Sequence, residues 1–157
     1  MKLSRNFSLP ELTHSQTALR HGIGNRPSPA ETERLYYLAR TLLEPVRDFV
    51  GRPFSPTSGF RSLALNRLIG SADTSQHVRG EAVDLKIPGL YPPELAGWIR
   101  RNLTFDQLIL EFHSPDDPAS GWVHCSVVDP VRRRDNRNQA LVFDGVKYRE
   151  MDDVYSG

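Results

Sequence analysis

The chain of 157 residues contains a single cysteine, Cys125, and carries a formal net charge of only +1 at pH 7. One cysteine excludes an internal disulfide and a cysteine-rich zinc site, so any metal ligands must be His, Asp or Glu. The near-neutral charge gives no electrostatic reason to expect a nucleic-acid partner. No apolar run approaches the roughly 18 residues of a membrane-spanning helix, and the N-terminal sequence lacks the apolar core of a signal peptide. We therefore expect a protein made in the cytoplasm without an export signal.

The composition is that of a folded chain. Hydrophobic residues make up 38% and charged residues 25%, which is typical of globular proteins and not of disordered ones. A chain of this length suits one compact domain with a substantial core. We expect a single domain over residues 1–157, with its core at about 7–145, and a monomer.

Helical patterns dominate the first half of the chain. Residues 7–22 read as a short helix that Ser8 caps, and residues 30–51 as a longer one that Pro45 kinks and Gly51 ends. Two further helices are predicted over 61–71 and, opened by a Pro-Pro pair, over 92–102.

Strand patterns follow in the second half. Residues 80–88 alternate, and 105–112 and 121–128 are strong strands joined by a Pro- and Asp-rich loop, which predicts a hairpin. Short strands are also expected at 53–60 and near 140–145, and the basic stretch 131–137 is expected to be a solvated loop. The prediction is an α+β fold with a small, mostly antiparallel sheet packed with helices.

A candidate metal site emerges from three side chains. His77 precedes the predicted strand that carries Asp84, and His124 lies in the predicted strand 121–128. If these strands are neighbours, the three side chains converge and leave a fourth coordination position open, as in catalytic zinc sites. Mn²⁺, Co²⁺ and Ni²⁺ accept the same ligand types. Taken singly, a solvated histidine and an edge aspartate are the commoner readings. Aspartate is rare in strands, however, and a cation would offset the cost of burying it.

Several stretches together resemble one known family. "SGFRS", "SQHVRGEAVDL", "FDQLILEF" and "GWVHCS" are similar to the zinc D-alanyl-D-alanine carboxypeptidases and endopeptidases, which share their fold with lysostaphin and the hedgehog signalling domains. The resemblance covers about residues 7–128. It implies one zinc ion per chain, held by His77, Asp84 and His124.

The same resemblance implies further site residues. Arg61 matches the arginine that binds the scissile carbonyl oxygen, Ser75 a substrate-binding position, and Gly80 the turn between the first two ligands. From the residues alone, Arg61 is equally well explained as a helix cap or an ion-pair partner. Trp122 is expected either to wall the substrate cleft or to anchor the hairpin.

The catalytic base is the point at which the chain departs from the family pattern. Many members carry an acidic residue two or three positions before the last histidine, but here Gly121 and Trp122 stand there. Glu111 ends the strand expected to pair with that of His124, so we expect it to reach the site and act as base. Asp116 and Asp117 are the alternatives, although they read as turn formers at the loop tip.

The resemblance thus implies a peptidase of bacterial peptidoglycan that hydrolyses a bond of the stem peptide or cross-link next to D-Ala. A chain without a signal peptide fits a phage endolysin that acts on the host cell wall. Two alternatives remain open. One is a non-catalytic zinc domain with a structural or recognition role in a phage virion, and the other is a cytoplasmic D-Ala-D-Ala dipeptidase.

Overall fold

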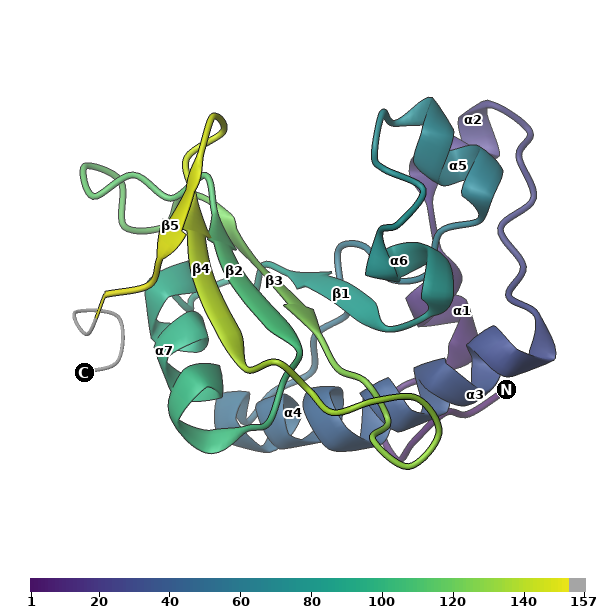
Figure 1. Cartoon of the computed structure of the whole chain (residues 1–157), viewed down its shortest axis with the longest axis horizontal. Coiled ribbons are helices and arrows are strands. Elements are labelled where there is room, and N and C mark those ends of the chain that lie inside the picture. Colours follow the sequence, from purple (N-terminus) through teal and green to yellow (C-terminus); the bar gives the residue numbers. More distant parts are fainter. Residues whose placement is uncertain (153–157) are drawn as a thin grey trace. The chain divides into compact units, whose positions relative to one another are not determined.

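The computed structural model describes residues 1–152 (Figure 1). The chain divides into two compact units, an N-terminal unit of Met1–Val83 and a C-terminal unit that begins at Asp84. The prediction of a single domain over 1–157 stays a prediction. Within the described residues, no helix is both long and apolar enough to cross a membrane.

The N-terminal unit opens with two short helices in place of the single predicted one. Helix α1 spans Leu9–Thr13 and begins with the expected Ser8 cap, completed by Glu11 as a capping box. Helix α2 spans Gln16–Arg20, because the Ser15 hydroxyl accepts a hydrogen bond from the Ala18 N–H and starts a second helix. The prediction of one continuous helix was wrong because this second cap was overlooked.

The long helix of this unit is distorted where Pro45 predicts a kink. It consists of α3 (Pro29–Leu38), a π-helical turn η1 (Ala39–Leu43) and α4 (Glu44–Val50). Proline has no N–H to donate and its ring needs room in the preceding turn, so the widened turn directly before it has a physical cause. Gly51 ends the helix with a φ of 75°, as predicted.

Residues 53–60 do not form the predicted strand. The segment is hydrogen-bonded to the last turn of α1, since the Phe60 N–H donates to the Leu12 carbonyl over 2.7 Å. Gly59 lies so close to Leu12 that a Cβ at this position would overlap the Leu12 backbone. Helix α5 (Leu63–Leu68) follows, with Ser62 as its cap.

A five-stranded sheet has the order β1-β3-β2-β4-β5. Its strands are β1 (Ala82–Leu85), β2 (Gln107–Glu111), β3 (Trp122–Ser126), β4 (Gln139–Phe143) and β5 (Tyr148–Glu150). Strands β2 and β3 form the predicted antiparallel pair, whereas β4 lies parallel to β2, which was not expected. Helix α7 (Pro92–Asn102) lies against the sheet (Figure 1). The α+β prediction is confirmed.

The two faces of the sheet differ in character. Leu110, Val123 and Val142 share one cross-strand row and are buried, which is the apolar face that a packed helix requires. In the neighbouring cross-strand row, Glu111 on β2 is paired with Trp122 on β3. His124 lies two residues further along β3 and therefore on the same face of the sheet as Glu111. Glu111 and His124 therefore lie on the face opposite the apolar one.

The basic stretch 131–137 is a largely exposed loop, as predicted, but two of its arginines also make ion pairs that the sequence did not predict. Arg134 and Arg137 turn inward onto the side chain of Asp106, which has no exposed surface, with shortest N–O distances of 2.7 Å each. Burial by itself raises the pKa of Asp106, but hydrogen bonds from both guanidinium groups and from the Arg137 N–H hold that pKa well below its ordinary value. This cluster fastens the connection that precedes β4 to the start of β2.

Candidate metal centre

His77 lies on a short helix and not in a loop. Helix α6 spans Gln76–Arg79, and His77 is 3% exposed. Its Nδ1 is 2.7 Å from the carbonyl oxygen of Gly59. A carbonyl only accepts, so Nδ1 must carry the proton, and the lone pair of the ring is left on Nε2. The packed segment 53–60 thus fixes the tautomer that a metal ligand needs.

Gly80 makes the predicted turn between the first two ligands. It ends α6 in the left-handed conformation, with a φ of 77°. A Cβ here would lie 2.7 Å from the backbone oxygen of Glu31, so both the conformation and the space require glycine. The chain enters β1 directly afterwards and reaches Asp84.

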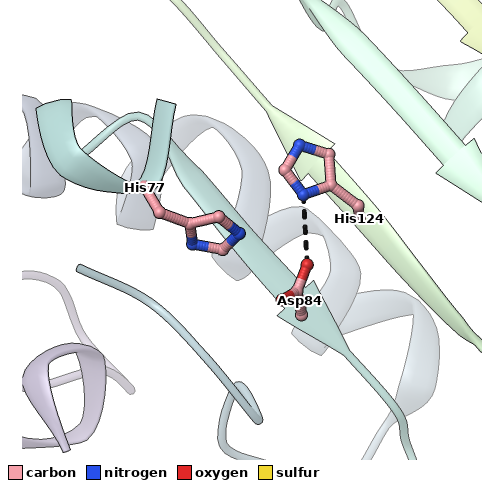
Figure 2. A group of neighbouring side chains, drawn as sticks. All are labelled: His77, Asp84 and His124. Atoms are coloured by element: carbon pink, nitrogen blue, oxygen red, sulfur yellow. Dashed lines mark hydrogen bonds and ion pairs between the residues drawn. The ribbon is translucent and has the colours of Figure 1, made fainter. Parts of the chain in front are cut away.

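Asp84 and His124 face one another. The Oδ1 atom of Asp84 and the Nδ1 atom of His124 are 3.1 Å apart, and the two side chains are only 14% and 12% exposed. One ligand atom from each of His77, Asp84 and His124 lies within 4.8 Å of the others. Figure 2 shows the two rings and the carboxylate turned toward a common point, from α6, β1 and β3.

The chemistry of these donors fits a divalent cation. A carboxylate and two imidazoles are ligands that Zn²⁺ prefers, and three ligands leave a position open for water or substrate. The contact between Nδ1 of His124 and Oδ1 of Asp84 places an imidazole nitrogen and a carboxylate oxygen side by side, as two ligands of one cation would be.

Arg61 is held in place by neighbours in the N-terminal unit. Its Nε donates to the Ser58 hydroxyl over 3.2 Å and its Nη1 to the Asn66 amide oxygen over 3.3 Å. The Arg61 N–H also donates to the carbonyl of His77, so the arginine and the ligand helix are fastened together. Arg61 lines an open hollow of about 260 Å³ with nine other residues: His14, Ser15, Gln16, Thr17, Thr57, Ser58, Phe60, Leu65 and Ile69.

Asn66 is a residue that sequence reasoning missed. It is completely buried, and its amide nitrogen donates to the Ala72 carbonyl, which leaves the amide oxygen for Arg61. Asn66 directly follows the buried Leu65 in α5, and a buried amide needs specific partners.

Glu111 lies on the same face of the sheet as His124. Its Cα is directly opposite that of Trp122, two residues before His124, so Glu111 and His124 are diagonal neighbours. Such neighbours are about 7–8 Å apart, within reach of a long side chain. Asp117 instead accepts a hydrogen bond from the Ala119 N–H in the exposed loop, as a turn former does. The role of Glu111 as base stays a prediction, with Asp116 and Asp117 as the alternatives.

Ser75 has a structural task in the fold. Its hydroxyl accepts a hydrogen bond from the His77 N–H and caps α6. The hydroxyl hydrogen is not used by that bond, so a substrate-binding role for Ser75 stays a prediction. The ring of Trp122 packs on that of Phe112, with centroids 5.0 Å apart.

Gly121 closes the loop between β2 and β3. Its φ is 80°, and a Cβ would lie 2.7 Å from the His113 nitrogen and even closer to the backbone oxygen of Glu111. The two strand ends therefore meet backbone to backbone at this glycine. Cys125, one residue beyond His124, is fully buried as predicted, and burial raises the pKa of its thiol.

Comparison with known proteins gives one family. The family model described as Peptidase M15 matches residues 5–126, a range that contains Arg61, Ser75, Glu111 and all three candidate ligands. Among curated proteins, no sequence matches. Because the matched range is well over half of the chain, and because it brings a His/Asp/His group together on the α+β fold, the chain belongs to the Peptidase M15 family of metallopeptidases.

Proposed function

We propose that this protein is a zinc-dependent peptidase of bacterial peptidoglycan that hydrolyses a bond next to D-Ala in the stem peptide or cross-link. The observation that carries the proposal is the convergence of His77, Asp84 and His124 in a chain of the Peptidase M15 family. The resemblance of the motifs to D-alanyl-D-alanine carboxypeptidases and endopeptidases supports the choice of bond.

Each residue has a task in such a reaction. His77, Asp84 and His124 hold the ion, which supplies Lewis-acid activation of water and of the scissile carbonyl when bound. Glu111 takes the proton of the attacking water and passes it to the leaving nitrogen. Arg61 presents a planar, permanently charged donor to the oxygen on which negative charge develops.

The proposal extends to the place of action. We infer that the peptidase acts on the host cell wall as a phage-encoded endolysin, which reaches the wall after lysis begins; membership of the Peptidase M15 family supports a wall peptide as the substrate.

The test uses the zinc-loaded protein on purified bacterial sacculi. We expect the turbidity of the suspension to fall and muropeptide mass spectrometry to reveal new ends next to D-Ala. Glu111→Gln should keep one zinc ion per chain but lower the rate by about 10²–10⁴-fold, as removal of a general base does. Asp116→Asn and Asp117→Asn are the matched controls and should retain activity.

A second candidate function has one observation in its favour. Gly121 and Trp122 stand where many relatives of similar motif carry an acid, which fits a zinc domain used for recognition in a virion. Fully zinc-loaded protein that releases nothing from sacculi would support this reading and contradict the enzyme. Turnover of free D-Ala-D-Ala in preference to cross-linked muropeptides would instead favour a cytoplasmic dipeptidase.

A further inference from the structure

A row of side chains crosses the C-terminal sheet beside His124. Trp122 on β3 lies opposite Glu111 on β2, which pairs with Phe143 on β4, which in turn pairs with Tyr148 on β5. Residues paired in this way present their side chains on one face of a sheet. Glu111, the proposed base, thus has aromatic residues on both sides.

The rings of this row are joined by Phe112. Its centroid is 5.0 Å from that of Trp122 and 5.5 Å from that of Phe143, and Phe143 stacks on Tyr148 at 4.4 Å. Phe112 and Tyr148 are 46% and 56% exposed. We call these four residues, Phe112, Trp122, Phe143 and Tyr148, the aromatic surface. It runs without a break from beside the metal ligand His124 to the edge strand β5.

The backbone of Phe112 is arranged to place its ring on this surface. By strand alternation, the residue after Glu111 should point to the apolar face. Phe112 has a φ of 56°, a left-handed conformation that is costly for a bulky residue, and its ring contacts Trp122 and Phe143 instead. The turn residue Gly145 leaves room for the ring, since a Cβ there would lie 2.8 Å from it. Phe112 thus adopts an unfavourable backbone conformation that places a half-exposed aromatic ring on this surface.

We propose that the aromatic surface binds the sugar rings of the peptidoglycan glycan strand. The inference rests on the proposed function, because a stem peptide held at His124 and Glu111 is attached to that strand, and the surface is continuous with both residues. A pyranose ring offers a flat array of C–H groups to the electron-rich face of an aromatic ring while its hydroxyls stay in water. The sugars to which stem peptides are attached carry no charge. The residues paired with Glu111, Trp122 and Phe143, are likewise uncharged, so the contact requires no opposite charge.

The binding experiment uses the full chain and a soluble β-1,4-linked N-acetylglucosamine oligomer. In an NMR titration, we expect shifts at Phe112, Trp122 and Tyr148, and no comparable shifts at Tyr91, which is 52% exposed at the start of α7. This measurement does not depend on hydrolysis. Shifts in a protein without peptidase activity would contradict the proposed function but support the sugar-binding surface.

The kinetic experiment compares a sugar-bearing muropeptide with the same peptide freed of sugar. In Tyr148→Ala, we expect the ratio of the two kcat/KM values to fall about fivefold to tenfold, a change of the size that aromatic packing supplies. Tyr148→Phe keeps the ring and should preserve the ratio, and Tyr91→Ala is the matched control for loss of an exposed tyrosine. Thermal melting verifies that each variant is folded.

Two results would overturn the inference. One is an unchanged ratio in Tyr148→Ala together with no titration by the oligomer. The other is a concentration-dependent dimer that Tyr148→Ala abolishes, again without sugar-induced shifts, since the aromatic surface would then be a contact between two copies of the chain.

Discussion

Replacement of Asp106 by asparagine removes the negative charge at the start of β2 while keeping the shape of the side chain. Asp106 accepts hydrogen bonds from Nη1 and Nη2 of Arg134 and from the N–H, Nε and Nη2 of Arg137. An asparagine keeps one accepting oxygen, but its NH₂ group then faces guanidinium donors. Breaking a buried ion pair costs about 3–5 kcal/mol. The arginine side chains are 38% and 51% exposed and regain water, so we expect a loss of about 2–3 kcal/mol.

The assay is urea unfolding at neutral pH, supported by thermal melting. A loss of this size lowers the Tm by about 5–10 °C in a chain of this length. The pH dependence follows from the lowered pKa of Asp106 in the folded state. The unfolded chain binds the proton first as the pH falls, so the stabilisation is complete well above the ordinary pKa of 3.8 and decreases below it. The difference between wild type and Asp106→Asn should therefore be constant from neutral pH down to about pH 5 and then narrow.

The matched control is Asp73→Asn. Asp73 makes the same two-point contact with Arg67, at 3.0 and 2.7 Å, but both side chains are more than half exposed. Exposed pairs of this kind contribute little, so the control should change stability far less. Equal losses in the two variants, or a difference at pH 2 that is as large as the difference at neutral pH, would refute the assignment of Asp106 as a buried charge held by two arginines.

Two further predictions concern the candidate metal centre. Gly80→Ala forces a Cβ into a left-handed position against the Glu31 backbone and should lower the free energy of unfolding by about 1–3 kcal/mol in a urea titration; wild-type stability would contradict the assigned backbone geometry. Removal of metal with EDTA should lower the Tm, because an ion at a hundredfold excess over its Kd stabilises the folded state by about 2.7 kcal/mol. Asp84→Asn should weaken this EDTA response strongly, and a response as large as that of wild type would exclude Asp84 as a ligand.

Local rules predicted several parts of the fold that depend on neighbouring residues, although the cap at Ser15 was overlooked. The cap at Ser8, the distortion before Pro45 and the turn at Gly80 follow from side-chain chemistry within a few positions. The pairing of β2 with β3 also follows, because a short loop joins two strongly apolar strands. The three candidate ligands could be predicted because each lies in or next to an element that the sequence pattern indicates.

Long-range contacts account for what the sequence did not reveal. The parallel pairing of β4 with β2 depends on the segment before β4, which Arg134 and Arg137 fasten to Asp106. These charged residues are far apart in the sequence, so no local sequence pattern indicates that they form ion pairs. Likewise Gly59 is fixed by contact with Leu12, far away in the chain, so its segment looked like a strand when read alone.

Because Gly121 closes the loop between β2 and β3, the positions of Glu111 and His124 on the sheet do not depend on the length of that loop. Because the backbones of Glu111 and Gly121 touch, the residues from His113 to Ser120 form a side branch whose size does not alter the pairing of Glu111 with Trp122. The number of residues between the proposed base and His124 is then free to vary without changing their separation in space. A chain of this kind can acquire insertions in that loop and keep its reaction, and fixed-spacing motifs will fail to recognise it.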